Sequence, residues 1–145
     1  MLRGRFGDTS GRPYLEGRLI IPRIGIRGSI SFLIDTGADT TTILPDDSRR
    51  LGVDYSTLKL ARSSTVGIGG TSRLYAERGI VVFTDPGKWL YAYEINLGIS
   101  PYDKALKSVH SLLGRDILDR WQMTYGPLRR NLRFTVLSAD LKIRL

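Results

Sequence analysis

The stretch FLIDTGADTTTI, residues 32–43, places a carboxylate at the end of an apolar run. Burying an unpaired charge is costly, so a fold keeps Asp35 there only if it has a partner or a functional role. Gly37 has no Cβ and lets the chain leave the preceding strand in a tight turn, which would present Asp35 at the apex of a loop. Thr36 has a hydroxyl that can form a hydrogen bond across to a neighbouring backbone.

A single carboxylate at this position would be a weak general base. Two carboxylates a hydrogen bond apart share one proton, because like charges that close do not both ionise easily. The near-repeat GDTSG at residues 7–11 has no apolar strand before it, and we interpret its Asp8 as a turn residue. A second copy of the chain is therefore the economical source of the second carboxylate, since a two-fold axis would place Asp35 beside its symmetry mate.

The composition is that of an ordinary globular domain and limits the possible chemistry. The chain has 145 residues, of which 41% are hydrophobic and 25% are charged, which predicts one domain with a sizeable core. It has no Cys, which excludes disulfides and thiolate metal sites, and the single His110 excludes a multi-histidine metal site within one chain. The segment KSVHSLLG around His110 matches no motif in which a His activates a Ser or Cys nucleophile. We therefore interpret His110 as an ordinary strand or loop residue. No metal or cofactor is expected.

The charge and hydropathy patterns bear on location and partners. No apolar run approaches the roughly 18 residues of a membrane span, and the N-terminus lacks the apolar core of a secretory signal, so we expect a cytoplasmic protein without a membrane partner. The net charge of +8, from 22 Lys and Arg against 14 Asp and Glu, permits attraction to nucleic acid. The basic residues are scattered, however, and form no basic helix or zinc module, which argues against a nucleic-acid partner.

Short apolar runs separated by Gly and Pro predict a mainly β domain over residues 15–145, preceded by a flexible arm over residues 1–14. We expect a hairpin of strands 18–26 and 29–34 with its turn near Arg27–Gly28, a long hairpin over 62–85, a strand over 89–99, and a last hairpin that turns at 127–131 and continues through 132–137. The segment 44–52 suits a turn or brief helix closed by Gly52. One short helix is predicted over 114–122, whereas 139–145 could be a strand, a helix or a tail.

Three motifs in this order are similar to a known family. LIDTGADTT at 33–41, VGIGG at 66–70 and LLGRDIL at 112–118 together resemble the retroviral-type, or retropepsin-like, aspartic proteases, and the chain looks most like their cellular and bacterial members. The resemblance covers roughly residues 18–122. It implies a closed, barrel-like β fold that forms a two-fold homodimer and works without a cofactor.

The resemblance also implies a role for each matching residue. Asp35 would be the catalytic residue, one from each subunit, and Thr36 would brace the two active-site loops across the subunit boundary. Arg115 would form a structural ion pair with Asp39, next to the packed Leu113–Gly114. The residues expected to line the cleft or to form a flap over the substrate are Gly37, Ala38, Asp39, Gly67, Ile68, Gly69 and Gly70.

The implied function is that of an aspartic endopeptidase. A water held between the two Asp35 carboxylates would hydrolyse a peptide bond of an extended peptide or an unfolded protein. The alternative is a retropepsin-like dimerisation or peptide-binding module with little turnover. The interval from Asp35 to Ile68 is longer than in the viral enzymes, and the apolar LRFTVL segment at 132–137 could supply the dimer sheet.

Overall fold

The computed structural model describes the backbone of residues 1–67 and 70–145 and the side chains of 1–59 and 73–145. The helices in these parts are short: α1 (Pro45–Leu51), α2 (Arg115–Leu118), and the 3-10 turns η1 (Pro22–Ile24), η2 (Tyr55–Thr57), η3 (Lys104–Leu106) and η4 (Pro127–Arg129). The strands are β1 (Leu2–Arg3), β2 (Arg5–Phe6), β3 (Pro13–Ile21), β4 (Ile26–Ile34), β5 (Thr42–Ile43), β6 (Leu60–Gly67), β7 (Gly70–Asp85), β8 (Trp89–Ile99), β9 (Leu112–Leu113), β10 (Trp121–Gly126), β11 (Asn131–Val136) and β12 (Leu141–Arg144).

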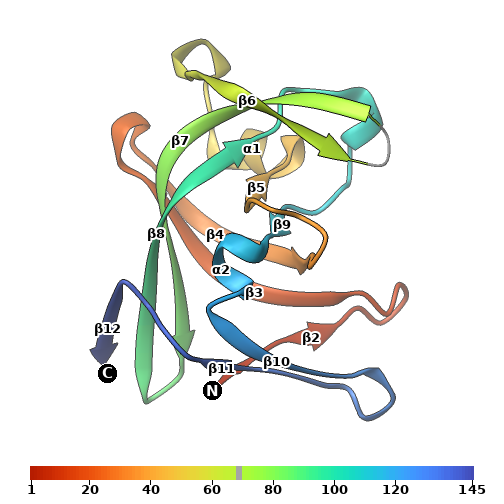
Figure 1. Cartoon of the computed structure of the whole chain (residues 1–145), viewed down its shortest axis with the longest axis vertical. Coiled ribbons are helices and arrows are strands. Elements are labelled where there is room, and N and C mark those ends of the chain that lie inside the picture. Colours follow the sequence, from red (N-terminus) through yellow and green to blue (C-terminus); the bar gives the residue numbers. More distant parts are fainter. Residues whose placement is uncertain (68–69) are drawn as a thin grey trace.

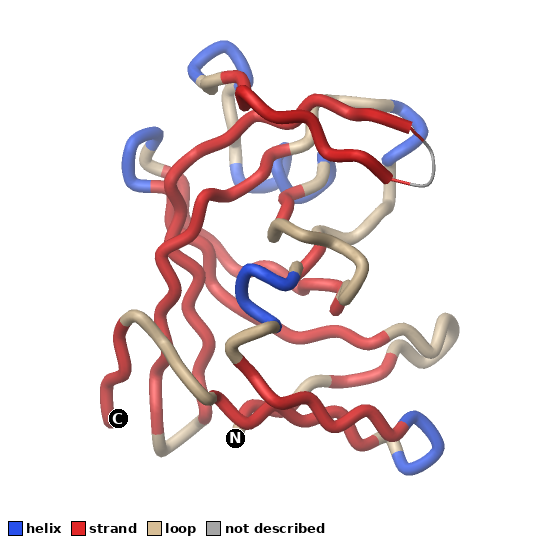
Figure 2. Tube along the Cα trace, in the orientation of Figure 1, coloured by secondary structure: helices blue, strands red, loops and turns tan. Residues whose placement is uncertain are grey.

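Six strands close into a barrel. They follow the order β8-β5-β9-β4-β3-β7, and β7 pairs again with β8 to complete the ring (Figure 1). Strand β6 extends this sheet beyond β7, and β12 extends it beyond β8. A second sheet of order β1-β11-β10 lies below the barrel in the view of Figures 1 and 2. The prediction of a mainly β, barrel-like fold is confirmed, whereas the homodimer stays a prediction.

The core forms because apolar residues alternate along the barrel strands. Leu15, Gly17, Leu19 and Ile21 of β3 are buried, while the alternate residues Glu16, Arg18 and Ile20 are exposed. Aromatic rings fill the space between the two sheets: Trp121 lies edge-on to Phe83, with ring centroids 4.9 Å apart. Its indole Nε1–H donates to the hydroxyl of Tyr93 at 2.7 Å, which satisfies the polar atom of a buried ring.

The turn between β3 and β4 differs from the prediction at Arg27–Gly28. Those residues lie within the ladder, where Arg27 pairs with Ile20 and Gly28 with Leu19. The chain turns instead at η1, which Pro22 opens with its fixed φ, and Gly25 closes it with a φ of 66° in the left-handed region. The correct turn signal was therefore the Pro22–Gly25 spacing.

The prediction of a flexible arm is wrong for Leu2–Phe6. Strand β1 pairs with β11 and β2 pairs with β3, and the side chains of Leu2 and Phe6 are buried. The sequence did not predict these strands because Leu2 and Phe6, the two apolar residues among Gly and Arg, form no visible hydrophobic periodicity. In addition, the strand that pairs with β1 lies near the other end of the chain. Residues 7–11 do form the expected turn, in which Gly11 N–H donates to Gly7 O at 2.9 Å.

The helix predicted over 114–122 is shorter than expected. It ends at Leu118, because Trp121 starts β10 opposite Val136 and turns its ring into the aromatic core. A further helix, α1, occupies the segment 44–52 and ends at Gly52 with a φ of 80°. The hairpins of β6–β7 and β10–β11 and strand β8 are confirmed, and the C-terminal segment forms β12. No helix within the described residues is long and apolar enough to cross a membrane.

Candidate active site

Asp35 lies at the point where β4 leaves the barrel. The last residues of β4 run parallel to β9, with Ile34 beside Leu113, and the Asp35 N–H donates to Leu113 O at 3.0 Å. The chain then turns back, since Ala38 N–H donates to Asp35 O at 3.2 Å. Gly37 N–H donates to the Asp35 carboxylate at 2.9 Å, and the side chain is half-buried. The carboxylate is thus oriented at a loop apex, as the DTG motif predicts.

The junction where β9 ends and α2 begins, residues 113–116, packs against the Asp35 loop and is called the second loop. Arg115 N–H donates to Ala38 O at 2.8 Å. Gly114 permits the close approach, because a Cβ there would lie 2.6 Å from the carbonyl carbon of Thr40 and 2.9 Å from Ala38 O. The LLGR segment therefore braces the Asp35 loop through main-chain contacts.

The predicted contact between Arg115 and Asp39 is present. Arg115 Nη2 bonds Asp39 Oδ1, and the two side chains are 48% and 72% exposed. Exposed ion pairs contribute little to stability, typically under about 1 kcal/mol. The contact is therefore suited to orienting the loop, and its role in supporting the active site stays a prediction.

A buried hydrogen-bond network that the sequence prediction missed joins the same two loops. Thr41 is fully buried; its Oγ1 donates to Asp116 Oδ1 at 2.6 Å, and its N–H donates to Asp116 Oδ2 at 2.9 Å. Gly114 N–H in turn donates to Thr41 Oγ1 at 3.1 Å. The sequence feature that could have predicted this network is Asp116, a carboxylate that lies between Gly114 and the apolar Ile117.

The remaining predicted residues fall into two groups. Thr36 and Gly37 are exposed at the loop, and Thr36 makes no side-chain hydrogen bond within the described part of the chain. Gly67 and Gly70 face each other at the end of the β6–β7 hairpin. Ile68 and Gly69 lie outside the described residues. The bracing of two subunits by Thr36, and the contact of the predicted cleft and flap residues with substrate, stay predictions.

Asp8 does not supply the second carboxylate. Its Oδ1 accepts from Nη2 of Arg130, the residue that follows η4, at 2.9 Å. Asp116 is engaged by Thr41 and Asp39 by Arg115. Asp8, Asp39 and Asp116 are thus each bonded to another side chain, so none of these three is paired with Asp35.

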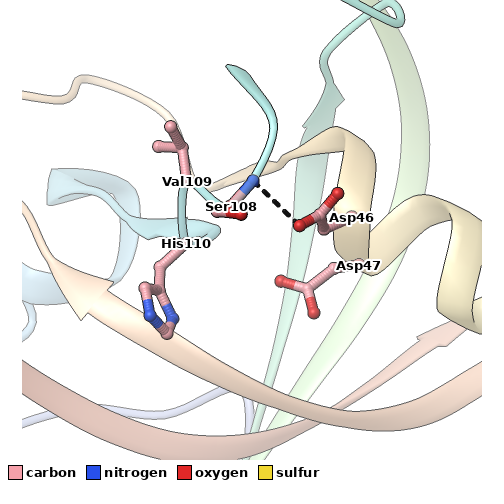
Figure 3. Close-up of a pocket in the computed structure, with 5 residues that line it drawn as sticks. All are labelled: Asp46, Asp47, Ser108, Val109 and His110. Carbon is pink, nitrogen blue, oxygen red and sulfur yellow. Dashed lines mark hydrogen bonds between the residues drawn. The ribbon is translucent and has the colours of Figure 1, made fainter. Parts of the chain in front are cut away.

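A separate cavity of about 250 Å³ is lined by Asp46, Asp47, Ser108, Val109 and His110 (Figure 3). Asp46 accepts from Ser108 N–H at 2.8 Å, and Asp47 accepts from Ser111 Oγ at 2.6 Å. The His110 ring packs against Tyr14, with centroids 4.6 Å apart. No group of three metal-ligating side chains occurs among the residues whose side chains are described. These contacts fix the approach to β9 and agree with His110 as an ordinary loop residue.

Comparison with known proteins places this geometry in a family. The model of the retroviral aspartyl protease family matches residues 12–125. A retropepsin-like aspartic protease from Rickettsia conorii is similar in structure, with a TM-score of 0.57 and 20% identity over 100% of this chain and 92% of that one. EIAV protease in complex with the inhibitor HBY-793 has a TM-score of 0.51 and 18% identity over 78% of this chain and 90% of that one. No curated protein gives a significant match. Since the family model covers most of the chain, the chain belongs to the retroviral aspartyl protease family.

Proposed function

We propose that the protein is a homodimeric aspartic endopeptidase. The observation that carries the proposal is the Asp35 carboxylate, oriented by Gly37 N–H at an apex that two hydrogen-bonded loops hold in place. Each chain offers one such carboxylate. A second copy related by a two-fold axis would complete the pair that this chemistry requires.

In the proposed reaction one Asp35 is ionised and its mate is protonated. The ionised carboxylate takes a proton from a bound water, whose oxygen attacks the scissile carbonyl carbon. The protonated mate donates to the carbonyl oxygen. The first carboxyl then gives the proton that it took from water to the leaving nitrogen, and the C–N bond breaks as the mate recovers a proton from a hydroxyl of the tetrahedral intermediate. Thr36, which is exposed beside Asp35, would bond across the two-fold axis. The substrate would be an extended peptide or an unfolded segment of a protein, bound by main-chain groups of Gly37, Ala38 and Asp39 and by the β6–β7 hairpin.

The second copy would pair through the β10–β11 hairpin. Strand β10 is an outer strand of its sheet, so part of its backbone is free to pair with another strand. Apolar side chains along and beyond it are exposed: Met123 by 37%, Tyr125 by 52% and Leu128 by 100%. Edge pairing of two such sheets would form one continuous sheet across the two-fold axis.

The test compares wild type with Asp35→Asn on an unstructured protein substrate from acid to neutral pH, with the mass of both proteins measured in solution. We expect wild type to cut and Asp35→Asn to lose at least about 10²-fold in kcat/KM, because the ionised base is lost. Both proteins should be dimers. If both are dimers and neither cuts, the fold would instead serve as a dimerisation or peptide-binding module.

A further inference from the structure

Glu77 is a charged residue in a buried position, away from Asp35. It lies on β7 with 4% of its side chain exposed. Arg23 of the η1 turn meets it with two nitrogens: Nε donates to Oε2 at 2.9 Å, and Nη2 bonds Oε1. The hydrogen bonds from Arg23 lower the pKa of Glu77, so the carboxylate is charged at neutral pH. A buried carboxylate needs such pairing, since an unpaired one would be strongly destabilising.

The pair joins three separate segments. Besides Glu77, Arg23 Nη2 donates to Thr57 O at 2.6 Å, at the end of η2. Lys59 N–H, just before β6, donates to Glu77 Oε1 at 3.4 Å, and Ala76 N–H donates to Lys59 O at 3.1 Å. Three segments therefore meet at this ion pair: the β3–β4 turn, the chain that enters β6, and the part of β7 that continues into the barrel.

This junction is the base of the β6–β7 hairpin. The hairpin pairs from Leu60 opposite Tyr75 to Gly67 opposite Gly70, with an irregular register between Leu60 and Ser64. Strand β6 ends its sheet and has β7 as its neighbour. A two-stranded ribbon has little stability of its own, so its direction depends on how its base is held. In Figure 1 the base lies beside η1 and η2 on the left, and the hairpin extends over the side of the barrel where β4 ends.

We infer that Arg23 and Glu77 are positioning residues that fix the direction of the β6–β7 hairpin relative to Asp35. The inference rests on the proposed peptidase function, in which that hairpin presents its main chain to the bound peptide. Neither residue would touch the reacting atoms. Their effect would reach the substrate through the two strands that they anchor.

Strand β7 provides a matched control. Arg78, the residue after Glu77 on β7, pairs with Glu94 of β8 at 2.7 Å, and these side chains are 64% and 54% exposed. This ion pair links two barrel strands through the same residue types but is exposed and does not contact the hairpin base. A general effect of removing one ion pair would appear in both places, whereas a positioning effect would appear at Arg23 and Glu77 alone.

The experiment uses Glu77→Gln, Arg23→Lys and the control Arg78→Gln in the full chain. We expect Glu77→Gln to raise KM for a peptide substrate about tenfold with kcat within about twofold of wild type, as expected for lost binding that ground and transition states share. Arg23→Lys keeps the charge but not the forked geometry and should lie between wild type and Glu77→Gln. Arg78→Gln should match wild type.

Hydrogen exchange supplies a readout that does not need activity. Amides of residues 60–67 and 70–77 should exchange at least about tenfold faster in Glu77→Gln, while those of 121–136 keep the wild-type rate. Unchanged KM and exchange would overturn the inference, as would acceleration spread evenly over the chain. If wild type cuts no substrate, the proposed function fails, and local exchange at the hairpin alone still decides whether the pair anchors it.

Discussion

Asp116 accepts two hydrogen bonds from Thr41, one from Oγ1 at 2.6 Å and one from the backbone N–H at 2.9 Å. Thr41 ends the loop that begins at Asp35, and Asp116 lies in the first turn of α2. The contact is buried on the Thr41 side, where the side chain is inaccessible to solvent. It therefore fixes the spacing of the two loops that hold the Asp35 carboxylate.

Thr41→Val should destabilise the fold by about 1–3 kcal/mol, because Asp116 and Gly114 N–H each lose a buried hydrogen-bond partner. Urea unfolding followed by tryptophan fluorescence measures the change. Asp119→Asn is the control: Asp119 is the exposed residue that follows the last turn of α2, and it makes no side-chain hydrogen bond within the described part of the chain. Equal stability of Thr41→Val and wild type would mean that the network adds nothing to the site's rigidity.

Gly114→Ala should lower the free energy of unfolding by about 1–3 kcal/mol. It should also lower kcat/KM relative to wild type. The new methyl group would lie within 2.9 Å of backbone atoms of Thr40 and Ala38, so one loop must shift. Gly126→Ala is the matched substitution, because the nearest atom to its Cβ, at 3.5 Å, belongs to Asn131 and leaves ordinary contact space. The two variants are compared by their free energies of unfolding, and cleavage by Gly114→Ala is compared with wild type because Gly126 lies in the proposed dimer hairpin. Equal stability of the two variants would contradict the close packing of the loops.

Arg115→Lys separates orientation of the loop from stability. The ion pair with Asp39 is exposed, so the free energy of unfolding should change by less than about 1 kcal/mol. If the forked guanidinium orients the Asp39 loop toward a peptide, kcat/KM should fall by more than the small change in unfolding free energy would explain. A loss of stability that accounts for the whole loss of activity would assign Arg115 a structural role alone.

The pH dependence of stability should depend on Glu77. Its folded pKa is lowered by the hydrogen bonds from Arg23, so the unfolded chain binds more protons in acid. The stabilising contribution is complete above the unfolded pKa of about 4.3 and is lost as the pH falls through the lower folded pKa. The difference in unfolding free energy between wild type and Glu77→Gln should therefore shrink from pH 6 to pH 3. Asp140, whose pKa is also lowered, is present in both proteins and cancels in the difference.

Local sequence pattern predicted the parts of this molecule that depend on neighbouring residues. The alternation in β8 and the apolar run before Asp35 each reflect a single strand, and the Asp85–Gly87 turn reflects a local backbone requirement at Gly87. The same holds for the position of Asp35 at a loop apex.

Contacts between distant residues left no such pattern. Thr41 and Asp116 are 75 residues apart in the chain, and Arg23 and Glu77 are 54 apart. Leu2 is buried because β1 pairs with β11, near the other end of the sequence. These residues look like ordinary surface or terminal residues until the barrel closes and supplies their partners.

The β10–β11 hairpin gives the prediction that bears most directly on the dimer. Removing the chain after Leu128 would be uninformative, because Leu132 and Phe134 belong to the core and the monomer would unfold. Leu128→Glu avoids this problem, since its side chain is fully exposed, and Met123→Lys adds a charge at the β10 edge.

In an Asp35→Asn background, which prevents self-digestion, the Met123→Lys and Leu128→Glu double variant should sediment as a folded monomer at concentrations where the parent is a dimer. Tyr102→Glu, at a residue 69% exposed and outside the β10–β11 hairpin, should remain dimeric. When residue 35 is Asp again, the double variant should cleave peptide only at raised protein concentration, because each active site needs two chains. A parent that sediments as a monomer would remove the basis for a shared carboxylate pair. A double variant that dimerises like the parent would place the interface on another surface.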